Sequence, residues 1–202
     1  MNIQRAVLAL VLVVALATPA LAGAPTDQLK QRVDEVIRVL SDPSLKDKTD
    51  ERRVTVRKIS EGVFDYQDTA RRSLGQHWNE RTPEEQREFV KLFGDLLERA
   101  YFSKIDRYQG EKVRYGAETI DGDEAQVKTT ITTNTGSDVP VDYRMHRVDD
   151  RWLVYDVTIE GVSMVSNYRS QFNKIVRTES YRALVERLKG KQTEASAAPA
   201  SR

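Results

Sequence analysis

The chain has few side chains suited to catalysis or metal binding. It contains two histidines, His77 and His146, and no cysteine. His77 precedes Trp78 in a predicted loop and His146 lies on the predicted outer face of a strand, so we interpret both as surface residues. The sequence has no glycine-rich phosphate-binding loop, serine nucleophile elbow or HExxH zinc motif. We therefore expect no catalytic residue, no metal site and no cofactor.

Asp156 and Glu160 are the remaining candidates for acid–base chemistry. Their spacing places both on one face of a predicted strand. A carboxylate in the apolar cavity of a curved sheet has a raised pKa and can act as a general base. The alternative is that both acids face solvent or pair with an arginine such as Arg144, Arg147 or Arg169. We favour this structural role, because nothing else in the sequence supplies an oxyanion stabiliser.

The two acids belong to residues 152–172, which we predict to be a strand followed directly by a helix. One face of the strand is apolar and comprises Leu153, Tyr155, Val157 and Ile159. Gly161 interrupts the alternation and allows the chain to bend. Ser163 is a predicted N-cap for a helix whose apolar face includes Val165, Tyr168 and Phe172. The strand and the helix must therefore bury against the same interior.

The first half of the chain is predicted to be helical. The first helix has Leu29, Val33, Ile37 and Leu40 on one face and stops near Asp42-Pro43. The second helix directs Val56, Ile59 and Val63 inward, and a short third helix is capped by Asp65 and ended by Gly75.

The fourth helix has the clearest local signal. Thr82-Pro83-Glu84-Glu85 combines an N-cap, a proline at the first helical position and the glutamate of a capping box. A broad apolar stripe then continues toward Gly110, through Phe89, Phe93, Leu96, Leu97, Ala100, Tyr101, Ile105 and Tyr108. Because a surface helix does not need so wide a stripe, we expect this helix to form a main wall of the interior.

After Gly110 the apolar residues alternate with polar ones, which predicts strands. Short turns at Asp121-Gly122, residues 134–137 and Asp149-Asp150 separate four predicted strands and require an antiparallel meander. The predicted fold class is therefore α+β, with N-terminal helices packed on a curved four-stranded sheet. A final helix is capped by Thr178 or Ser180 and runs through Leu188 to Gly190.

The N-terminus has the features of an export signal. Arg5 precedes an apolar run over residues 6–17 that is too short to span a membrane comfortably, and Ala20-Leu21-Ala22 fits a cleavage site. We predict a signal peptide at residues 1–22, a single domain at 23–190 and a disordered tail at 191–202. The absence of a cysteine after the cleavage site argues against a lipid anchor.

The charge balance excludes two classes of partner. Removal of residues 1–22 takes away Arg5 and no acid, which leaves 31 Lys plus Arg against 31 Asp plus Glu. A balanced chain lacks the basic excess that nucleic-acid binding requires. It also has no polybasic segment for anionic membranes.

Several segments together resemble the MlaC, or toluene-tolerance auxiliary, family of periplasmic phospholipid shuttles, and the resemblance covers roughly residues 30–190. The matching residues are Ala70-Arg71-Arg72-Ser73-Leu74-Gly75, Trp78, Leu96-Leu97-Glu98-Arg99, Tyr101, Val141-Asp142-Tyr143-Arg144, Tyr155-Asp156-Val157, Glu160-Gly161-Val162-Ser163 and Ser166-Asn167-Tyr168-Arg169-Ser170-Gln171-Phe172. None of these motifs has catalytic meaning.

The resemblance implies a carrier that holds a diacyl phospholipid as cargo, with its tails between sheet and helices. It also implies two partners: an outer-membrane lipoprotein–porin complex, and an inner-membrane ABC transporter with a membrane-anchored lipid-binding subunit. Such transport maintains outer-membrane lipid asymmetry. Exposure of about 30 methylenes at ~0.8 kcal/mol each costs on the order of 24 kcal/mol, so the tails need an enclosing protein.

On this reading an apolar cavity lies between the sheet and the helices. The lipid-binding side chains lie on the long helix, on the strands and at the strand-to-helix junction. They are Leu97, Tyr101, Ile105, Val127, Ile131, Tyr143, Met145, Val157, Ile159, Val162, Val165 and Phe172. The inward faces could instead meet in a filled core. The alternative functions are a cone-fold enzyme or small-ligand binder that uses Asp156, and a periplasmic adaptor that binds only proteins.

Overall fold

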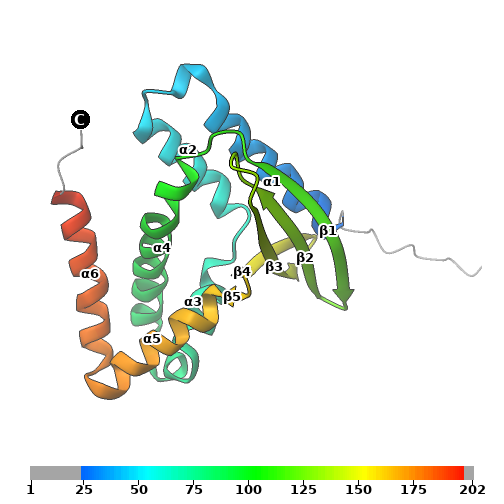
Figure 1. The fold of residues 1–202 in the computed structure, drawn as a ribbon. Helices are drawn as coiled ribbons and strands as arrows, with labels where there is room; N and C mark the ends of the chain where they lie inside the picture. Colours follow the sequence, from blue (N-terminus) through cyan, green and yellow to red (C-terminus); the bar gives the residue numbers. More distant parts are fainter. Residues whose placement is uncertain (1–23, 198–202) are drawn as a thin grey trace, which may run out of the picture.

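The computed structural model describes residues 24–197, with only the backbone described at 103–104 and 191–197. The predicted signal peptide at 1–22 and residues 198–202 of the predicted tail lie outside the described residues. The described chain is an α+β fold with six α-helices and one five-stranded antiparallel sheet (Figure 1). No helix within this part of the chain is long and apolar enough to cross a membrane.

Four of the helices, α3 to α6, begin where the local sequence predicts. They are α1 (Pro25–Ser41), α2 (Thr49–Glu61), α3 (Tyr66–Leu74), α4 (Pro83–Ile105), α5 (Met164–Thr178) and α6 (Tyr181–Ala197), with short 3₁₀ helices η1 (Pro43–Leu45) and η2 (Gly75–Glu80). Asp65 caps α3, Thr82 and Glu85 form the capping box of α4, and Ser163 caps α5. These four side chains satisfy backbone groups that a helix end leaves without partners.

Two helix ends differ from the prediction. Helix α4 ends at Ile105, before the last residue of the predicted stripe at Tyr108. The Ser180 hydroxyl oxygen caps helix α6 by accepting a hydrogen bond from the Ala183 N–H, and the helix continues to Ala197, past the predicted end at Gly190. It therefore includes part of the segment that we predicted to be a disordered tail.

The sheet is a meander in the order β1-β2-β3-β4-β5, with every neighbouring pair antiparallel. Its strands are β1 (Lys112–Asp121), β2 (Glu124–Thr132), β3 (Asp138–Val148), β4 (Arg151–Ile159) and β5 (Val162–Ser163). The prediction of four strands missed β5. Glu160 and Gly161 both have positive φ, 49° and 81°, and form a tight turn that folds β5 back along β4.

A β-bulge in β4 changes which side chains face inward. The register between β3 and β4 shifts between Arg144 and Met145, so that Met145 pairs with Val154 whereas Arg144 pairs with Asp156. As a result Trp152 and Val154 join the inward cluster with Val157 and Ile159. Leu153 and Tyr155 are buried, but the prediction that they share one face with Val157 and Ile159 is wrong, because the extra residue of the bulge reverses the alternation.

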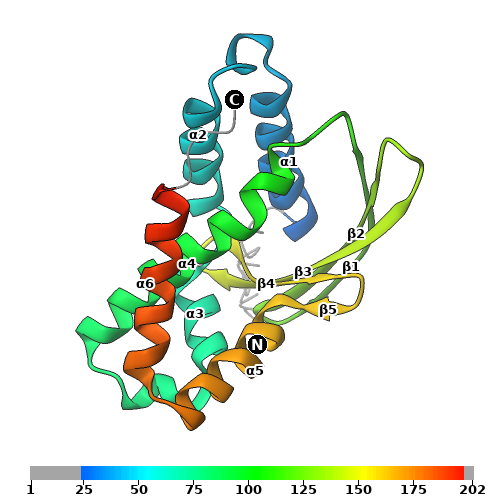
Figure 2. The ribbon, with the colours of Figure 1, turned by 60° about the vertical axis from the view of Figure 1, so that its left-hand side comes forward.

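The buried apolar residues form two clusters rather than one. The helical cluster joins α3, α4, α5 and α6 around Phe89, Phe93 and Phe172, whose rings are 5.2–5.9 Å apart between centroids. The sheet cluster joins β2, β3 and β4 to Leu29 of α1. Figure 2 shows the curved sheet on one side and α3, α4, α5 and α6 gathered on the other. Helix α4 therefore forms one side of the helical cluster, and its predicted apolar stripe packs mainly against other helices.

Candidate functional site

The inner face of the sheet, the face that α1 crosses, is apolar but incompletely covered. Val127, Val141 and Met145 are buried on it. Other apolar side chains of the same face pack against this cluster yet stay only partly buried: Tyr115, Ile131, Val139, Tyr143 and Ile159. We call these five residues the inner apolar surface. Partly exposed side chains in the middle of an apolar face indicate that the two layers do not fully close on each other.

The helices that border this surface are also incompletely packed. In α1 only Leu29 among the apolar residues after Pro25 is buried, whereas Val33, Val36 and Ile37 are half-buried. Tyr101 of α4 and Tyr168 of α5 pack against the helical cluster and remain partly exposed. Burial raises the pKa of both phenols, so both stay neutral at physiological pH.

Two tyrosines supply the polar groups of the inner apolar surface. The hydroxyl of Tyr115 is buried and has no hydrogen-bond partner among the described residues. Burial raises the pKa of Tyr115, and the nearby Tyr143 and Asp34 raise it further. Burial alone raises the pKa of Tyr143 to about 12, although its side chain keeps accessible surface. Both phenols are therefore neutral hydrogen-bond donors.

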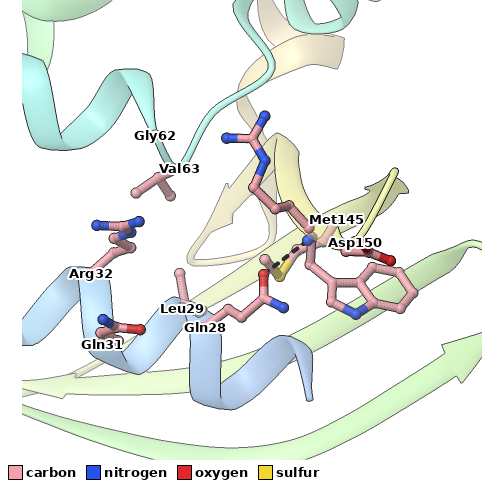
Figure 3. A pocket seen from close by; sticks show the side chains of 10 residues that line it. Gln28, Leu29, Gln31, Arg32, Gly62, Val63, Met145 and Asp150 are labelled. Carbon is pink, nitrogen blue, oxygen red and sulfur yellow. Dashed lines mark hydrogen bonds between the residues drawn. The ribbon is translucent and has the colours of Figure 1, made fainter. Parts of the chain in front are cut away.

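A small pocket lies at one end of the inner face, between α1, the connection after α2 and the β3–β4 hairpin. Its volume is about 200 Å³, and it is lined by Leu29, Val63, Met145 and Trp152 together with polar side chains (Figure 3). The Trp152 N–H donates to Gln28 Oε1 at 2.9 Å and fixes α1 against β4 here. This volume is below the roughly 300–1,000 Å³ of typical ligand pockets, so the pocket alone does not accommodate a lipid.

The structure divides the predicted lipid-binding residues between the two clusters. The sheet cluster contains Val127, Ile131, Tyr143, Met145, Val157 and Ile159. The helical cluster contains Leu97, Tyr101 and Phe172. Val165 is buried where α5 begins, and Ile105 is 38% exposed at the end of α4. The sheet residues are brought together on the inner face, whereas Leu97 and Phe172 lie within the helical core.

Val162 differs most from its prediction. We expected its side chain to point between strand and helix, but it is 61% exposed. The Glu160–Gly161 turn places Val162 in β5, opposite Ile159 and at the edge of the sheet. Val162 therefore lies at the rim of the inner face rather than within it.

Asp156 has a structural role in the observed geometry. Its carboxylate is 3% exposed and accepts hydrogen bonds from the Ser163 hydroxyl at 2.6 Å and from the Val165 N–H at 3.0 Å. Both partners lie at the start of α5, where an anion is favoured by unpaired N–H groups and the helix dipole. The carboxylate thus ties β4 to α5, and Glu160 is exposed in the turn beyond.

Both histidines are tethered rather than free at the surface. His77 is buried, and its Nε2 lies 3.0 Å from Asn173 Oδ1 of α5. His146 is half-buried, with Nε2 3.0 Å from Asp65 Oδ2. The expectation of a surface histidine is therefore wrong for His77, whereas His146 lies on the outer face as predicted and is partly exposed. Each histidine links two elements. Among the described residues no group of His, Cys, Asp and Glu side chains could hold a metal ion.

Sequence analysis did not single out Tyr115 and Val139 as site residues. Both alternate with polar neighbours along their strands, a pattern that indicates one apolar face, so the signal was present. What the pattern did not reveal is that the bulge between Tyr115 and Glu118 turns Glu118 onto the same face, where it accepts from the Thr26 N–H at 2.7 Å. This contact holds the first turn of α1 on β1.

The family model described as MlaC protein matches residues 30–190, a span that includes both layers and the whole inner apolar surface. The chain belongs to the MlaC family. This confirms the family resemblance of its sequence motifs.

Curated relatives and one solved structure agree with the family. The chain is 28% identical over 92 residues to the toluene tolerance protein ttg2D of Pseudomonas putida, covering 45% of this chain and 43% of that protein. It is 23% identical over 120 residues to the intermembrane phospholipid transport system binding protein MlaC of Haemophilus influenzae, covering 57% and 56%. The matches therefore span about half the length of these curated relatives.

The structural comparison covers more of the chain. The phospholipid-binding protein from Ralstonia solanacearum, solved in complex with a phospholipid, superimposes with a TM-score of 0.76 and 25% identity. The match covers 86% of this chain and 99% of that protein.

Proposed function

We propose that this protein is a phospholipid carrier whose cargo lies between the inner apolar surface and the facing helices. The observation that carries the proposal is the partly exposed apolar face in the middle of a fold shared with a phospholipid-bound relative. A fully closed core would bury these side chains, and a carrier needs them accessible. Acyl tails placed there would cover Ile131, Val139 and Ile159 and complete their burial.

The cargo space would form by separation of the two layers. The sheet and helical clusters have their own buried cores, so a change in the distance between them need not disrupt either. The pocket of about 200 Å³ would be only one end of the enlarged space. Of the predicted lipid contacts, those on the inner face and at its rim fit this role best, because Leu97 and Phe172 serve the helical core.

We further propose a cellular location and a lipid-transport route, both suggested by the family membership. The chain would be exported by cleavage before Gly23 and would shuttle phospholipid across the periplasm, between an outer-membrane lipoprotein–porin complex and an inner-membrane ABC transporter. This role needs no catalytic residue and no cofactor. The enzyme alternative loses its main candidate, since the Asp156 carboxylate caps α5.

Native mass spectrometry of protein purified from periplasm, followed by organic extraction, tests the proposal. We expect a complex whose extra mass matches an extracted phospholipid, and a mature chain that begins at Gly23. A protein-binding adaptor would carry no lipid, and delipidated protein that takes up none from vesicles would contradict the carrier function.

A further inference from the structure

The unpaired hydroxyl of Tyr115 requires an explanation. A buried hydroxyl without a partner is unfavourable, and native proteins contain few of them. Phenylalanine would fill the same position without this deficit. A tyrosine at an otherwise apolar site therefore suggests that its hydroxyl gains a partner in some other state of the protein.

Tyr143 lies on the same face and places a second phenol nearby. Tyr115 pairs with Thr129 in β2, and Thr129 pairs with Val141 in β3, two residues before Tyr143. The two phenols are close enough for Tyr143 to contribute to the raised pKa of Tyr115. Tyr143 retains accessible surface, whereas the Tyr115 hydroxyl is buried, and Asp34 of α1 lies close enough to contribute to the raised pKa of Tyr115.

Helix α1 is loosely enough packed to uncover Tyr115. It is fixed to the sheet at its first turns, through Leu29, Gln28 and the Thr26–Glu118 hydrogen bond. Further along, its apolar residues Val33 and Ile37 are only half-buried. An occupant that moved this part of α1 away from the sheet would reach both hydroxyls.

The residues around the two phenols indicate which kind of hydrogen-bond acceptor a ligand would place there. The residues of β2 and β3 that share this face are neutral: Ala125, Val127, Thr129, Ile131, Val139, Val141 and Met145. The Thr129 hydroxyl is already committed to the Val141 carbonyl at 2.7 Å. A phosphate among these neutral side chains and near the Asp34 carboxylate would be a buried anion, which is costly. A neutral ester carbonyl is a suitable acceptor for a neutral phenol.

We propose that Tyr115 and Tyr143 donate hydrogen bonds to the ester carbonyl oxygens of a diacyl glycerolipid and so distinguish it from ether lipids and plain hydrocarbons. The inference rests on the proposed carrier function and adds a determinant of specificity to it. The charged head group then lies away from the phenols, toward solvent.

Competitive displacement of a fluorescent phospholipid from delipidated protein tests the proposal. The competitors are the diester and diether forms of phosphatidylcholine with identical saturated chains. For the wild type we expect about tenfold weaker binding of the diether form, because two neutral hydrogen bonds are lost. Tyr143→Phe and Tyr115→Phe should each reduce this preference, and the double variant should abolish it.

Thermal unfolding of the delipidated variants provides an independent readout. Tyr115→Phe removes an unpaired buried hydroxyl, so its melting temperature should equal or exceed that of the wild type. The matched control is Tyr181→Phe, because the Tyr181 hydroxyl donates to the Glu85 carbonyl at 3.1 Å. The control should lose stability and keep the wild-type preference for the diester.

The outcomes separate this inference from the carrier function. Equal binding of the two lipids by the wild type, or an unchanged preference in the double variant, would overturn the role of the phenols and leave the carrier function intact. If the wild type bound neither lipid, the carrier function and this inference would both fail.

Discussion

At the scale of single residues, the burial and hydrogen bonds of Asp156 show whether it acts as a general base or as a structural cap. The sequence placed a carboxylate beside an apolar interior, which suits either a general base or a buried cap. The structure gives it two donors, the Ser163 hydroxyl and the Val165 N–H, both at the start of α5. The sequence alone could not decide this, because the turn that brings β5 and α5 back to β4 depends on backbone conformation at Glu160 and Gly161.

We predict that Asp156→Asn lowers stability without loss of cargo. An amide still accepts one of the two hydrogen bonds, but the charge-assisted bonds are worth about 1.5–3 kcal/mol, so a fall in melting temperature of several degrees is expected. Lipid per folded molecule, measured by extraction, should match the wild type. Ser163→Ala removes one donor to Asp156 together with the N-cap of α5, so it should also lower the melting temperature and should keep its lipid. A well-folded Asp156→Asn protein without lipid would show that Asp156 acts on the cargo.

Asp68 gives a pH-dependent contribution to stability. It is 6% exposed and accepts from Arg72 Nε at 2.6 Å and Arg71 Nε at 2.9 Å. Burial acts to raise the pKa of Asp68, but the hydrogen bonds from the two arginines outweigh it, so the pKa lies below the ordinary value. A lowered pKa in the folded state means that the stabilisation is complete above the unfolded pKa of about 3.9 and is lost as pH falls.

Melting temperatures of the wild type and Asp68→Asn should therefore converge in acid. We expect a difference of roughly 3–10 °C at pH 7, which shrinks progressively as the pH falls below about 4. Glu84→Gln is the control, because its ion pair with Arg87 is highly exposed and should contribute almost nothing. A difference between wild type and Asp68→Asn that did not change with pH would contradict this account.

At the scale of elements, the sequence predicted helix caps and turns correctly but did not predict which elements pack against each other. The Thr82–Glu85 capping box, the Asp65 and Ser163 caps and the Asp121-Gly122 turn depend on neighbouring residues, so the sequence predicted them. The stripe on α4 indicated only that one face is buried. Its partners are rings of α5 and α6 rather than strands, and this choice depends on contacts between distant parts of the chain.

Ion pairs join α2 to α4. Arg53 Nε and Arg57 Nη1 lie 2.7 Å and 2.8 Å from the two oxygens of Glu98, whose side chain is 14% exposed. Arg52 Nη2 lies 2.6 Å from Asp106 Oδ1 just beyond α4. Because α2 follows α1 in a helical hairpin, these ion pairs hold that hairpin against the helical layer. Separation of the layers would have to break them.

We predict that Glu98→Gln accelerates lipid transfer from the protein to acceptor vesicles several-fold. Neutralisation of Glu98 removes two ion pairs between α2 and α4 and so favours the separated state. Added salt should accelerate the wild type more than the variant, because less charge remains to screen. Glu84→Gln on the same helix is the control and should transfer lipid like the wild type. Identical rates in Glu98→Gln and the wild type would exclude α2–α4 separation as the limiting step.

At the scale of the whole molecule, the question that sequence could not answer is whether the inward faces meet. Apolar periodicity identifies a face, and a filled core and a lipid cavity have the same periodicity. The structure shows two buried clusters, with partly exposed residues on the face between them. Two exposed apolar side chains, Val162 and Ile120, mark opposite corners of the sheet, on β5 and on β1.

These two corners offer a matched test of where the cargo reaches the surface. Val162 is 61% exposed beside Ile159 of the inner apolar surface, and the buried Val165 follows at the start of α5. Ile120 is 51% exposed and lies near the end of α1 that Glu118 and Leu29 close against the sheet. Glutamate at either position adds a charge at an exposed site, so neither variant should lose more than about 1 kcal/mol of stability.

We predict that Val162→Glu purifies with much less phospholipid than the wild type, whereas Ile120→Glu retains it. A carboxylate at the rim beside Ile159 would be partly desolvated by bound acyl chains, which disfavours occupancy, while water hydrates it once the cargo leaves. Melting temperature and extracted lipid, measured on the same preparations, separate loss of cargo from loss of fold. Val127→Glu shows the contrast: Val127 is fully buried, so a charge there should unfold the protein. If lipid were lost from Ile120→Glu and kept by Val162→Glu, the cargo would emerge at the α1 corner instead.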